Sequence, residues 1–515
     1  MSRRALAAVL AAALLLLTAC GPAAPAEESG PPPSEELSET PAPSPEPTAP
    51  EPLALAWDPE DTLEPLRAGT VNQTLSPLVF EGLFALDAAF NPEPVLCLSY
   101  SRTNNDMSWT FLLQEGVTFS DGTPLTAEIV ARCLNAARNS DQYRARLSSV
   151  AAVRAGEGSV TLELSRACGN LPVLLDVPIF LTREEGYPLG TGPYCFAEEG
   201  GELCLSAVDR WWQGKQLPTG QFLLRQTPTA DDRIAAFDTG RVTLTDTDFS
   251  ATNALGYSTG YDVWDYYTSA LVYVGFNLQK SPCNSTNVRL AAARCLDREN
   301  IAATVFAGHA DGACLPVHPA TELYDASLAQ ALAYDPEEAA ALLGGDGWTA
   351  DGEGKLVKNG QRLELSLVVN SENAARSALA DTLAAELEAL GATVTVRRLT
   401  WENYQKALNQ GDFDLYIAQV KLTADFDPTA LLTGELNYGG IYDGEMNAVL
   451  ASFRASVGTA RVWLAYSLYA RLTLNVPIAP VCFTRGTVLT RWGRLFGLSP
   501  VQGNLFHGLE DWVVA

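Results

Sequence analysis

The stretch from Trp109 to Arg138, WTFLLQEGVTFSDGTPLTAEIVARCLNAAR, constrains the fold more than any other part of the chain. Apolar and polar residues alternate through 109–114 and again through 117–119, with a glycine between them, which is typical of two short strands. Residues 120–124 then carry turn-forming residues, and Thr126 can cap a helix whose apolar side chains share one stripe. The stretch therefore predicts a mixed α/β domain.

A second region gives independent evidence for α/β structure. Leucines alternate through residues 363–367, and further leucines recur on one helical face through 378–390. Gly391 ends that helix, and residues 393–396 again have the composition of a strand. Strand, helix and strand in this order predict a βαβ unit with parallel strands and a right-handed crossover.

Length and charge limit the possible organisation and partners. A chain of 515 residues, 47% of them hydrophobic, is too long for one ordinary core and predicts several lobes. The formal net charge of -27 argues against nucleic acid as a partner, because that partner would require a basic surface.

The N-terminus has the pattern of an export signal. Arg3 and Arg4 precede an apolar run over residues 5–17, which is too short to span a bilayer as a helix. The sequence Leu-Thr-Ala-Cys that ends at Cys20 resembles the lipobox of bacterial lipoproteins, which implies cleavage before Cys20 and a lipid on its thiol. The alternative is a plain secretory signal with a chance cysteine.

The segment after the signal, residues 21–52, is rich in Pro, Glu and Ser, which predicts a disordered tether.

Several phrases follow one another in an order that is similar to a known family. They are the stretch 109–138, Phe80-Glu81-Gly82-Leu83, the PLGTGPY turn at 188–194, the helix at 288–298 and the DPE…LL…GW phrase at 335–348. Together they resemble the family-5 extracytoplasmic solute-binding proteins, the oligopeptide and dipeptide receptors of bacterial ABC importers. The resemblance covers roughly residues 53–515.

The resemblance implies an architecture. It is an α/β fold of the type II periplasmic-binding-protein kind, a clamshell of two large lobes with an additional smaller lobe. Lobe I is expected to comprise residues 53–84, 188–281 and 486–515. The small lobe II is expected at 85–187, and lobe III at 282–485.

The resemblance also points to ligand-binding residues. In peptide-binding members, an aspartate in a W-x-A-D-x-x-D/E-P phrase pairs with the terminal ammonium of the ligand. Asp425 matches that aspartate, and Thr423 stands beside it in the same phrase. The phrase departs from the family because Leu422 replaces the tryptophan and one residue is missing before Pro428. The alternative for Asp425 is a turn carboxylate that bonds nearby backbone amides.

Three more residues are candidates for ligand contact. Trp401 matches an aromatic residue of the family and is either a pocket wall or a core residue of its helix. Tyr273 and Asn277 belong to a strand that is expected to cross between the large lobes, where a hinge role is as plausible as ligand contact.

Patterns for other chemistry are sparse. Residues 256–260 match G-x-S-x-G, but they lack the preceding apolar strand and the following amphipathic helix that expose a hydrolase serine. Residues 351–355 are better explained by a hairpin turn than by a calcium loop. The cysteines include no C-x-x-C pair, so no metal site or cofactor is indicated, although Cys195 and Cys204 could form a bridge across a hairpin.

The sequence therefore predicts a binding protein and not an enzyme. We expect a lipid-anchored monomer on the extracytoplasmic face of a bacterial membrane, which binds a small molecule or, preferably, a short peptide. Its partners would be an ABC permease with its ATPase subunits. A ligand-sensing surface receptor without transport is the main alternative, and a surface serine hydrolase is disfavoured.

Overall fold

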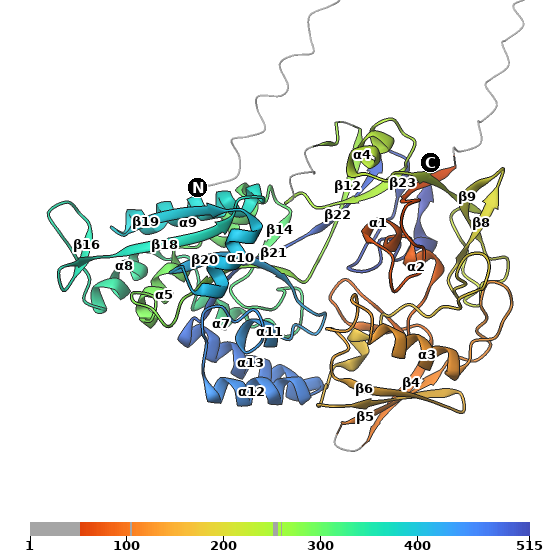
Figure 1. The fold of residues 1–515 in the computed structure, drawn as a ribbon, viewed down its shortest axis with the longest axis horizontal. Helices are drawn as coiled ribbons and strands as arrows, with labels where there is room; N and C mark the ends of the chain where they lie inside the picture. The colour runs from red at the N-terminus through yellow and green to blue at the C-terminus, as the bar shows by residue number, and fades with distance from the viewer. Residues whose placement is uncertain (1–51, 104–105, 251–255, 259) are drawn as a thin grey trace, which may run out of the picture. The chain divides into compact units, whose positions relative to one another are not determined.

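A computed structural model of the chain describes residues 52–103, 106–250, 256–258 and 260–515 (Figure 1). The described residues form one compact unit. The expected signal peptide with Cys20, and the expected tether up to residue 51, lie outside the described residues.

The first large sheet has seven strands in the order β12-β22-β11-β1-β10-β9-β8. These strands are β1 (Leu53–Trp57), β8 (Tyr194–Glu199), β9 (Glu202–Ala207), β10 (Gln221–Gln226), β11 (Leu244–Thr247), β12 (Tyr261–Tyr266) and β22 (Gly486–Arg491). Strand β1 runs parallel to both β10 and β11, and the remaining neighbours are antiparallel. The side chains of Leu53, Leu55 and Phe222 are buried here, which fits the apolar composition of these strands.

The second large sheet has six strands in the order β14-β21-β13-β20-β18-β19. They are β13 (Ala270–Phe276), β14 (Ala310–Gly312), β18 (Glu364–Asn370), β19 (Thr393–Leu399), β20 (Leu415–Lys421) and β21 (Ile478–Thr484). Strands β18 and β19 are parallel and are joined by α9 (Ala374–Ala389), so the predicted βαβ unit is confirmed. Leu379, Leu383 and Leu387 of α9 are buried, because their spacing places them on one face of the helix.

The third sheet has four antiparallel strands, β4 (Cys97–Thr103), β5 (Ser108–Leu113), β7 (Ser159–Leu164) and β6 (Val150–Gly156). Helix α3 (Ala127–Ala137) packs on β6 and β7. The predicted cap is confirmed, since the Thr126 side chain accepts a hydrogen bond from the Ile129 amide. Residues 117–119 differ from the expected second strand: they contribute only an isolated bridge between Thr118 and Pro124.

The chain passes between the two large sheets twice, from β12 to β13 and back from β21 to β22. Strand β13 thus pairs inside the six-stranded sheet, although the sequence-based division places residues 188–281 in lobe I. Strand β13 begins only a few residues after β12 ends, so no long linker marks the crossing.

The remaining elements connect or cover these sheets. They are α1 (Thr70–Gln73), α2 (Ser76–Val79), β2 (Phe84–Leu86), β3 (Pro92–Pro94), α4 (Ala230–Asp238), α5 (Thr286–Arg294), α6 (Arg298–Thr304), α7 (Ala326–Gln330), α8 (Pro336–Gly345), β15 (Thr349–Ala350), β16 (Leu356–Lys358), β17 (Gln361–Arg362), α10 (Trp401–Gln410), α11 (Thr429–Leu432), α12 (Gly444–Ala455), α13 (Gly458–Asn475), β23 (Leu495–Phe496) and β24 (Val513–Val514), with 3₁₀ turns at Leu171–Leu174 and Leu509–Asp511.

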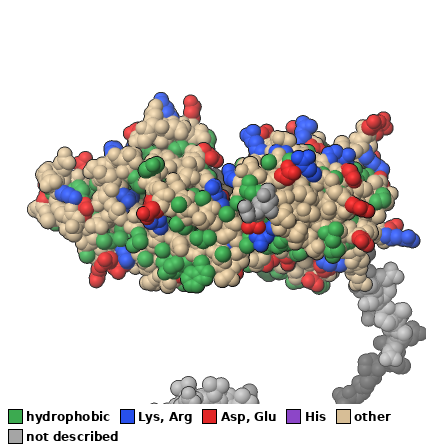
Figure 2. All heavy atoms as spheres, turned by 90° about the horizontal axis from the view of Figure 1, so that it is seen from below, with side chains coloured by type: hydrophobic (Ala, Val, Ile, Leu, Met, Phe, Trp, Pro, Cys, Tyr) green, Lys and Arg blue, Asp and Glu red, His purple; other side chains and the backbone are tan. Residues whose placement is uncertain are grey.

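Charged side chains of both signs are mixed on the surface. Figure 2 shows Lys and Arg scattered among Asp and Glu, with apolar side chains between them, on the face turned toward the viewer. Helix α13 leaves the side chains of Trp463 and Leu474 mostly exposed.

Candidate functional site

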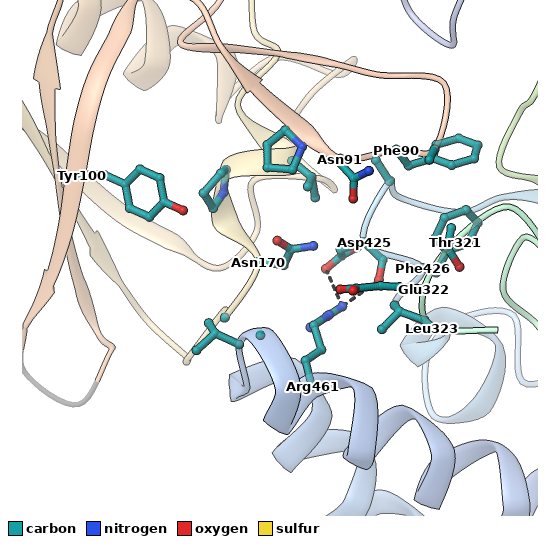
Figure 3. A pocket seen from close by; sticks show the side chains of 18 of the residues that line it. Phe90, Asn91, Tyr100, Asn170, Thr321, Glu322, Leu323, Asp425, Phe426 and Arg461 are labelled. Atoms are coloured by element: carbon teal, nitrogen blue, oxygen red, sulfur yellow. Dashed lines mark hydrogen bonds and ion pairs between the residues drawn. The ribbon is translucent and has the colours of Figure 1, made fainter. Parts of the chain in front are cut away.

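A pocket of about 230 Å³ is lined by the turn between β2 and β3, by strands β4 and β5, by loops after β7, β14 and β20, and by the start of α13 (Figure 3). Ligand pockets usually measure about 300–1,000 Å³, so this one suits a small ligand or one end of a longer ligand. Its lining residues are Ala89, Phe90, Asn91, Pro92, Tyr100, Arg102, Trp109, Gly169, Asn170, Pro172, Val173, Thr321, Glu322, Leu323, Ala424, Asp425, Phe426, Val457, Gly458 and Arg461.

Asp425 lies in the loop that follows β20, and its side chain is almost completely buried at the pocket wall. The hydroxyl of Thr423 donates a hydrogen bond of 2.5 Å to Oδ1 of Asp425. Arg461 rises from the first turns of α13, donates from Nη2 to the backbone oxygen of Asp425 at 2.7 Å, and places Nη2 3.9 Å from Oδ2. The carboxylate therefore has a cation close by, while its Oδ2 is beyond hydrogen-bond distance of that cation.

Arg461 is held on several sides. Its Nη1 donates to the backbone oxygen of Phe453 at 3.1 Å, and its guanidinium carbon lies 4.0 Å from the centre of the Phe453 ring. These contacts hold the guanidinium in place, and Figure 3 shows it next to Asp425. The hydrogen bonds to the carbonyl oxygens of Asp425 and Phe453 stabilise the buried guanidinium, whereas Oδ2 of Asp425 receives no hydrogen bond from it.

A second aspartate follows two residues later. Asp427 accepts a hydrogen bond of 3.0 Å from the Thr429 amide. Burial raises the pKa of Asp427, and the charge of Asp425 raises it further. Two adjacent carboxylates in a confined space cannot both be ionised without cost, which favours a cation near Asp425.

The opposite wall is aromatic and polar. Tyr100 and Trp109 come from β4 and β5, with their ring centres 5.6 Å apart, and the guanidinium of Arg102 lies 5.3 Å from the centre of the Trp109 ring. Glu322, whose side chain is exposed, adds a second carboxylate to the rim. Groups of both charges thus border the pocket, an arrangement that suits a ligand carrying opposite charges.

The structure places the five predicted ligand residues in different surroundings. Asp425 lines the pocket, and Thr423 bonds to its carboxylate without being part of the lining. Trp401 is 50% exposed on α10 and stacks on Tyr404, away from the pocket lining. Tyr273 is buried in β13, where its ring packs against Tyr416.

Asn277, the fifth of these residues, bonds to backbone carbonyl groups through its side chain. Its Nδ2 donates to the carbonyl oxygens of Gly411 and Phe413, which ties the end of β13 to the loop before β20. Contact of Trp401, Tyr273 and Asn277 with ligand stays a prediction. Sequence reasoning missed Phe90 and Arg461, because neither carries a local pattern that marks it as part of a site.

The other candidate chemistry finds no support in the described residues. The amide of Ser258 bonds to the Asp238 carboxylate, and Thr259 of the same motif lies outside the described residues. In the loop at 351–355 the Asp351 carboxylate accepts bonds from the amides of Glu353 and Lys355 between strands β15 and β16, as the hairpin interpretation predicts.

Cys195 and Cys204 are both free thiols. Within the described part of the chain, no three His, Cys, Asp or Glu residues are grouped so that they could hold a metal ion.

The fold agrees with that of known binding proteins. The crystal structure of a nickel ABC transporter protein from Bacillus halodurans superposes with a TM-score of 0.74 at 19% identity, covering 88% of this chain and 98% of that one. The predicted class, a multi-lobed α/β fold of the type II periplasmic binding kind, is confirmed. None of the described helices is both long enough and apolar enough to cross a membrane.

The sequence comparison is more specific. The family described as bacterial extracellular solute-binding proteins, family 5, middle, matches residues 91–440. The oligopeptide-binding protein AppA of Bacillus subtilis is 25% identical over 369 residues, which are 65% of this chain and 66% of AppA. The nickel-binding periplasmic protein of Escherichia coli is 24% identical over 417 residues, or 75% of this chain and 78% of that protein.

The chain belongs to family 5 of the bacterial extracellular solute-binding proteins. Members of this family are extracytoplasmic binding proteins and not enzymes; they bind peptides or small ligands and work with the permease of an ABC importer.

Proposed function

We propose that this protein captures a short peptide in the pocket around Asp425 and delivers it to an ABC permease. The observation that carries the proposal is the position of Asp425: a nearly buried carboxylate at a pocket wall, with Oδ2 outside hydrogen-bond distance of Arg461. A peptide ammonium can offer the hydrogen bond that this oxygen lacks. The relative AppA, named an oligopeptide-binding protein, supports the ligand class.

The proposal assigns roles to Asp425 and Thr423. Asp425 receives the ammonium, and Thr423 holds Oδ1 so that Oδ2 faces the ligand. Glu322 at the rim adds negative charge for the approaching ammonium, while Arg102 and Arg461 offer cations for the ligand's carboxyl groups.

The proposal includes anchoring and motion. Cys20 carries a lipid, residues 21–52 act as a tether, and the body is a monomer outside the membrane. The two crossings, β12 to β13 and β21 to β22, form the hinge about which the lobes close, since few backbone connections join the large sheets.

Mass spectrometry of the small molecules released from the purified mature protein tests the function. We expect short peptides with free N-termini, enriched over a sample in which Asp425 is replaced by asparagine. Recovery of a metal chelate or a sugar in stoichiometric amount, with no peptide, would show that the ligand class is wrong.

A further inference from the structure

Phe90 occupies a backbone conformation that suits its side chain poorly. It closes the turn between β2 and β3 with φ of 65°, in the left-handed region that glycine and asparagine favour and bulky residues avoid. The turn itself is well made, because Oδ1 of Asp87 accepts hydrogen bonds of 2.8 Å from the amides of Ala89 and Asn91. A glycine would make the same turn without strain, so the phenyl ring must serve a purpose beyond the turn.

The ring of Phe90 is buried against residues that are far away in the sequence. Its centre lies 5.0 Å from that of Phe426, with the two rings nearly perpendicular, and 5.5 Å from that of His318. This edge-to-face geometry is a favourable arrangement of two aromatic rings. The side chains of Phe90, Phe426 and His318 are all buried.

Phe426 shares the same unusual backbone. Its φ is 51°, and it follows Asp425 directly in the chain. The left-handed conformation turns the chain immediately after the carboxylate, and the Phe426 amide bonds back to the Thr423 carbonyl at 2.9 Å. Strained conformations persist only where the surrounding packing enforces them, and the ring of Phe90 supplies such packing.

A second contact near the pocket joins the segment that follows β7 to the end of α12. The Gly169 amide donates to the Arg454 carbonyl at 2.6 Å. A Cβ atom at Gly169 would lie 1.9 Å from the backbone oxygen of Ser456, so no larger residue fits there. Phe90, Phe426 and Gly169 all line the pocket.

We infer that Phe90 is a positioning residue for ligand binding: its ring clamps Phe426 and thereby holds the Asp425 loop, residues 422–428, in the conformation that presents the carboxylate to the pocket. The inference rests on the proposed function for the role of Asp425. The effect of Phe90 on the loop is independent of any ligand, which allows the two to be tested separately.

The test compares Phe90→Gly and Phe90→Asn, which suit the left-handed turn but lack the ring, with Phe90→Leu, which keeps apolar bulk. Asn359→Gly is the matched control, because Asn359 also has a positive φ, of 54°, in the exposed turn before β17. Hydrogen exchange of the full-length protein is followed by mass spectrometry at a temperature where every variant is folded. Peptides that cover residues 422–428 report on the loop, and peptides that cover β18 report on global stability.

We expect exchange of the loop to become about tenfold faster in the glycine and asparagine variants, with β18 unchanged and with partial recovery in the leucine variant. Unchanged loop exchange, or an equal acceleration in β18, would overturn the inference, because the second outcome indicates only a lost core side chain.

A binding measurement then separates this inference from the proposed function. The wild type and the Phe90 variants are incubated with a tryptic digest of casein, before and after acetylation of its amines, and captured peptides are quantified by mass spectrometry. If the wild type captures no peptide, or captures both digests equally, the proposed function is wrong, and the loop exchange still decides the role of Phe90 in shaping the loop. If the wild type prefers free amines and the glycine variant keeps the same preference, the inference is wrong.

Discussion

A hydrogen bond of 2.9 Å joins the carboxylate of Asp265 to Nδ1 of His309 and thereby links the two large sheets. Asp265 belongs to β12, and His309 directly precedes β14. Thr487 on β22 donates to the same carboxylate at 2.6 Å. Arg485, in the second crossing, lies 3.8 Å from Asp265 and binds Asp311 through two nitrogens. One polar network therefore holds both crossings.

We expect Asp265→Asn and His309→Gln to lower the free energy of unfolding by about 1–3 kcal/mol each, because each leaves a partly buried polar partner unsatisfied. In a double-mutant cycle the two changes should be non-additive by about 0.5–3 kcal/mol, as measured by urea unfolding. The exposed pair Asp381 and Arg398 is the control, with an expected coupling below about 1 kcal/mol. Strict additivity of Asp265 and His309 would contradict the link.

The lowered pKa of Asp311 predicts that the protein loses stability in acid. Burial alone would raise its pKa, but two hydrogen bonds from Arg485, together with the positive charge of that guanidinium, outweigh burial and lower the pKa to about 2. Because the folded-state pKa lies below the unfolded value, this contribution is present above about pH 4 and is lost as the pH falls through about 2. It amounts to at most about 2 kcal/mol after solvent screening.

The check is urea unfolding of the wild type and Asp311→Asn at about pH 5 and about pH 2.5. The variant should be less stable at the higher pH, and the difference between the proteins should shrink at the lower pH. A constant difference would mean that Asp311 does not titrate in this way.

Glu81 predicts the opposite pH dependence. Thr191, Trp212 and Gln213 each donate a hydrogen bond of 2.7 Å to its carboxylate. Burial outweighs these bonds and raises the pKa of Glu81 to about 7. Since the folded-state pKa lies above the unfolded value, the contribution to stability is complete below about pH 4.5 and is lost as the pH rises through about 7.

Unfolding free energies at about pH 5 and pH 8 should therefore differ by up to about 3 kcal/mol more in the wild type than in Glu81→Gln, which cannot titrate. The same pH slope in both proteins would assign the dependence to another group. Thermal melting at the same two pH values provides a second measure.

Removal of the Asp425 carboxylate should weaken binding of a peptide ligand by about 2–5 kcal/mol, because the ammonium would remain buried without a partner. Calorimetry with Asp425→Ala and the identified peptide measures the loss, and the N-acetylated peptide should bind the variant and the wild type alike. Equal affinity of the wild type for the free and acetylated peptides would remove the ammonium role from Asp425.

Replacement of Cys20 by alanine should release the protein from membranes, because the polar tether offers no apolar surface of its own. Fractionation of cells that express the wild type and Cys20→Ala tests this expectation. Retention of the variant in the membrane fraction at the wild-type level would point to a different attachment.

The sequence predicted what short-range patterns encode. The cap at Thr126 and the strands around α9 follow from residue spacing alone, because a periodicity of about two or 3.6 reports which face is buried. Thr423 and Asp425 lie two residues apart, so one phrase could indicate both.

Contacts between residues far apart in the sequence could not be predicted from such local patterns. Arg461 meets Asp425 across 36 residues of sequence, and Phe90 meets Phe426 from a different part of the fold. Periodicity shows that Tyr273 lies in a strand, but it cannot tell whether the aromatic ring faces a core or a ligand. In the structure the ring faces Tyr416 in the core.

The free cysteines have a practical consequence for measuring motion. Cys97, Cys133, Cys168, Cys195, Cys283, Cys295, Cys314 and Cys482 lie in surroundings where burial raises the thiol pKa, and the remaining free thiol, Cys204, is itself buried. Reagents such as maleimides react with the thiolate, which is scarce near neutral pH at the eight positions with a raised thiol pKa. In the mature body, a cysteine introduced on each large sheet would therefore accept fluorophores ahead of the native thiols. The distance between such a pair could be followed in single molecules without first removing the natural cysteines.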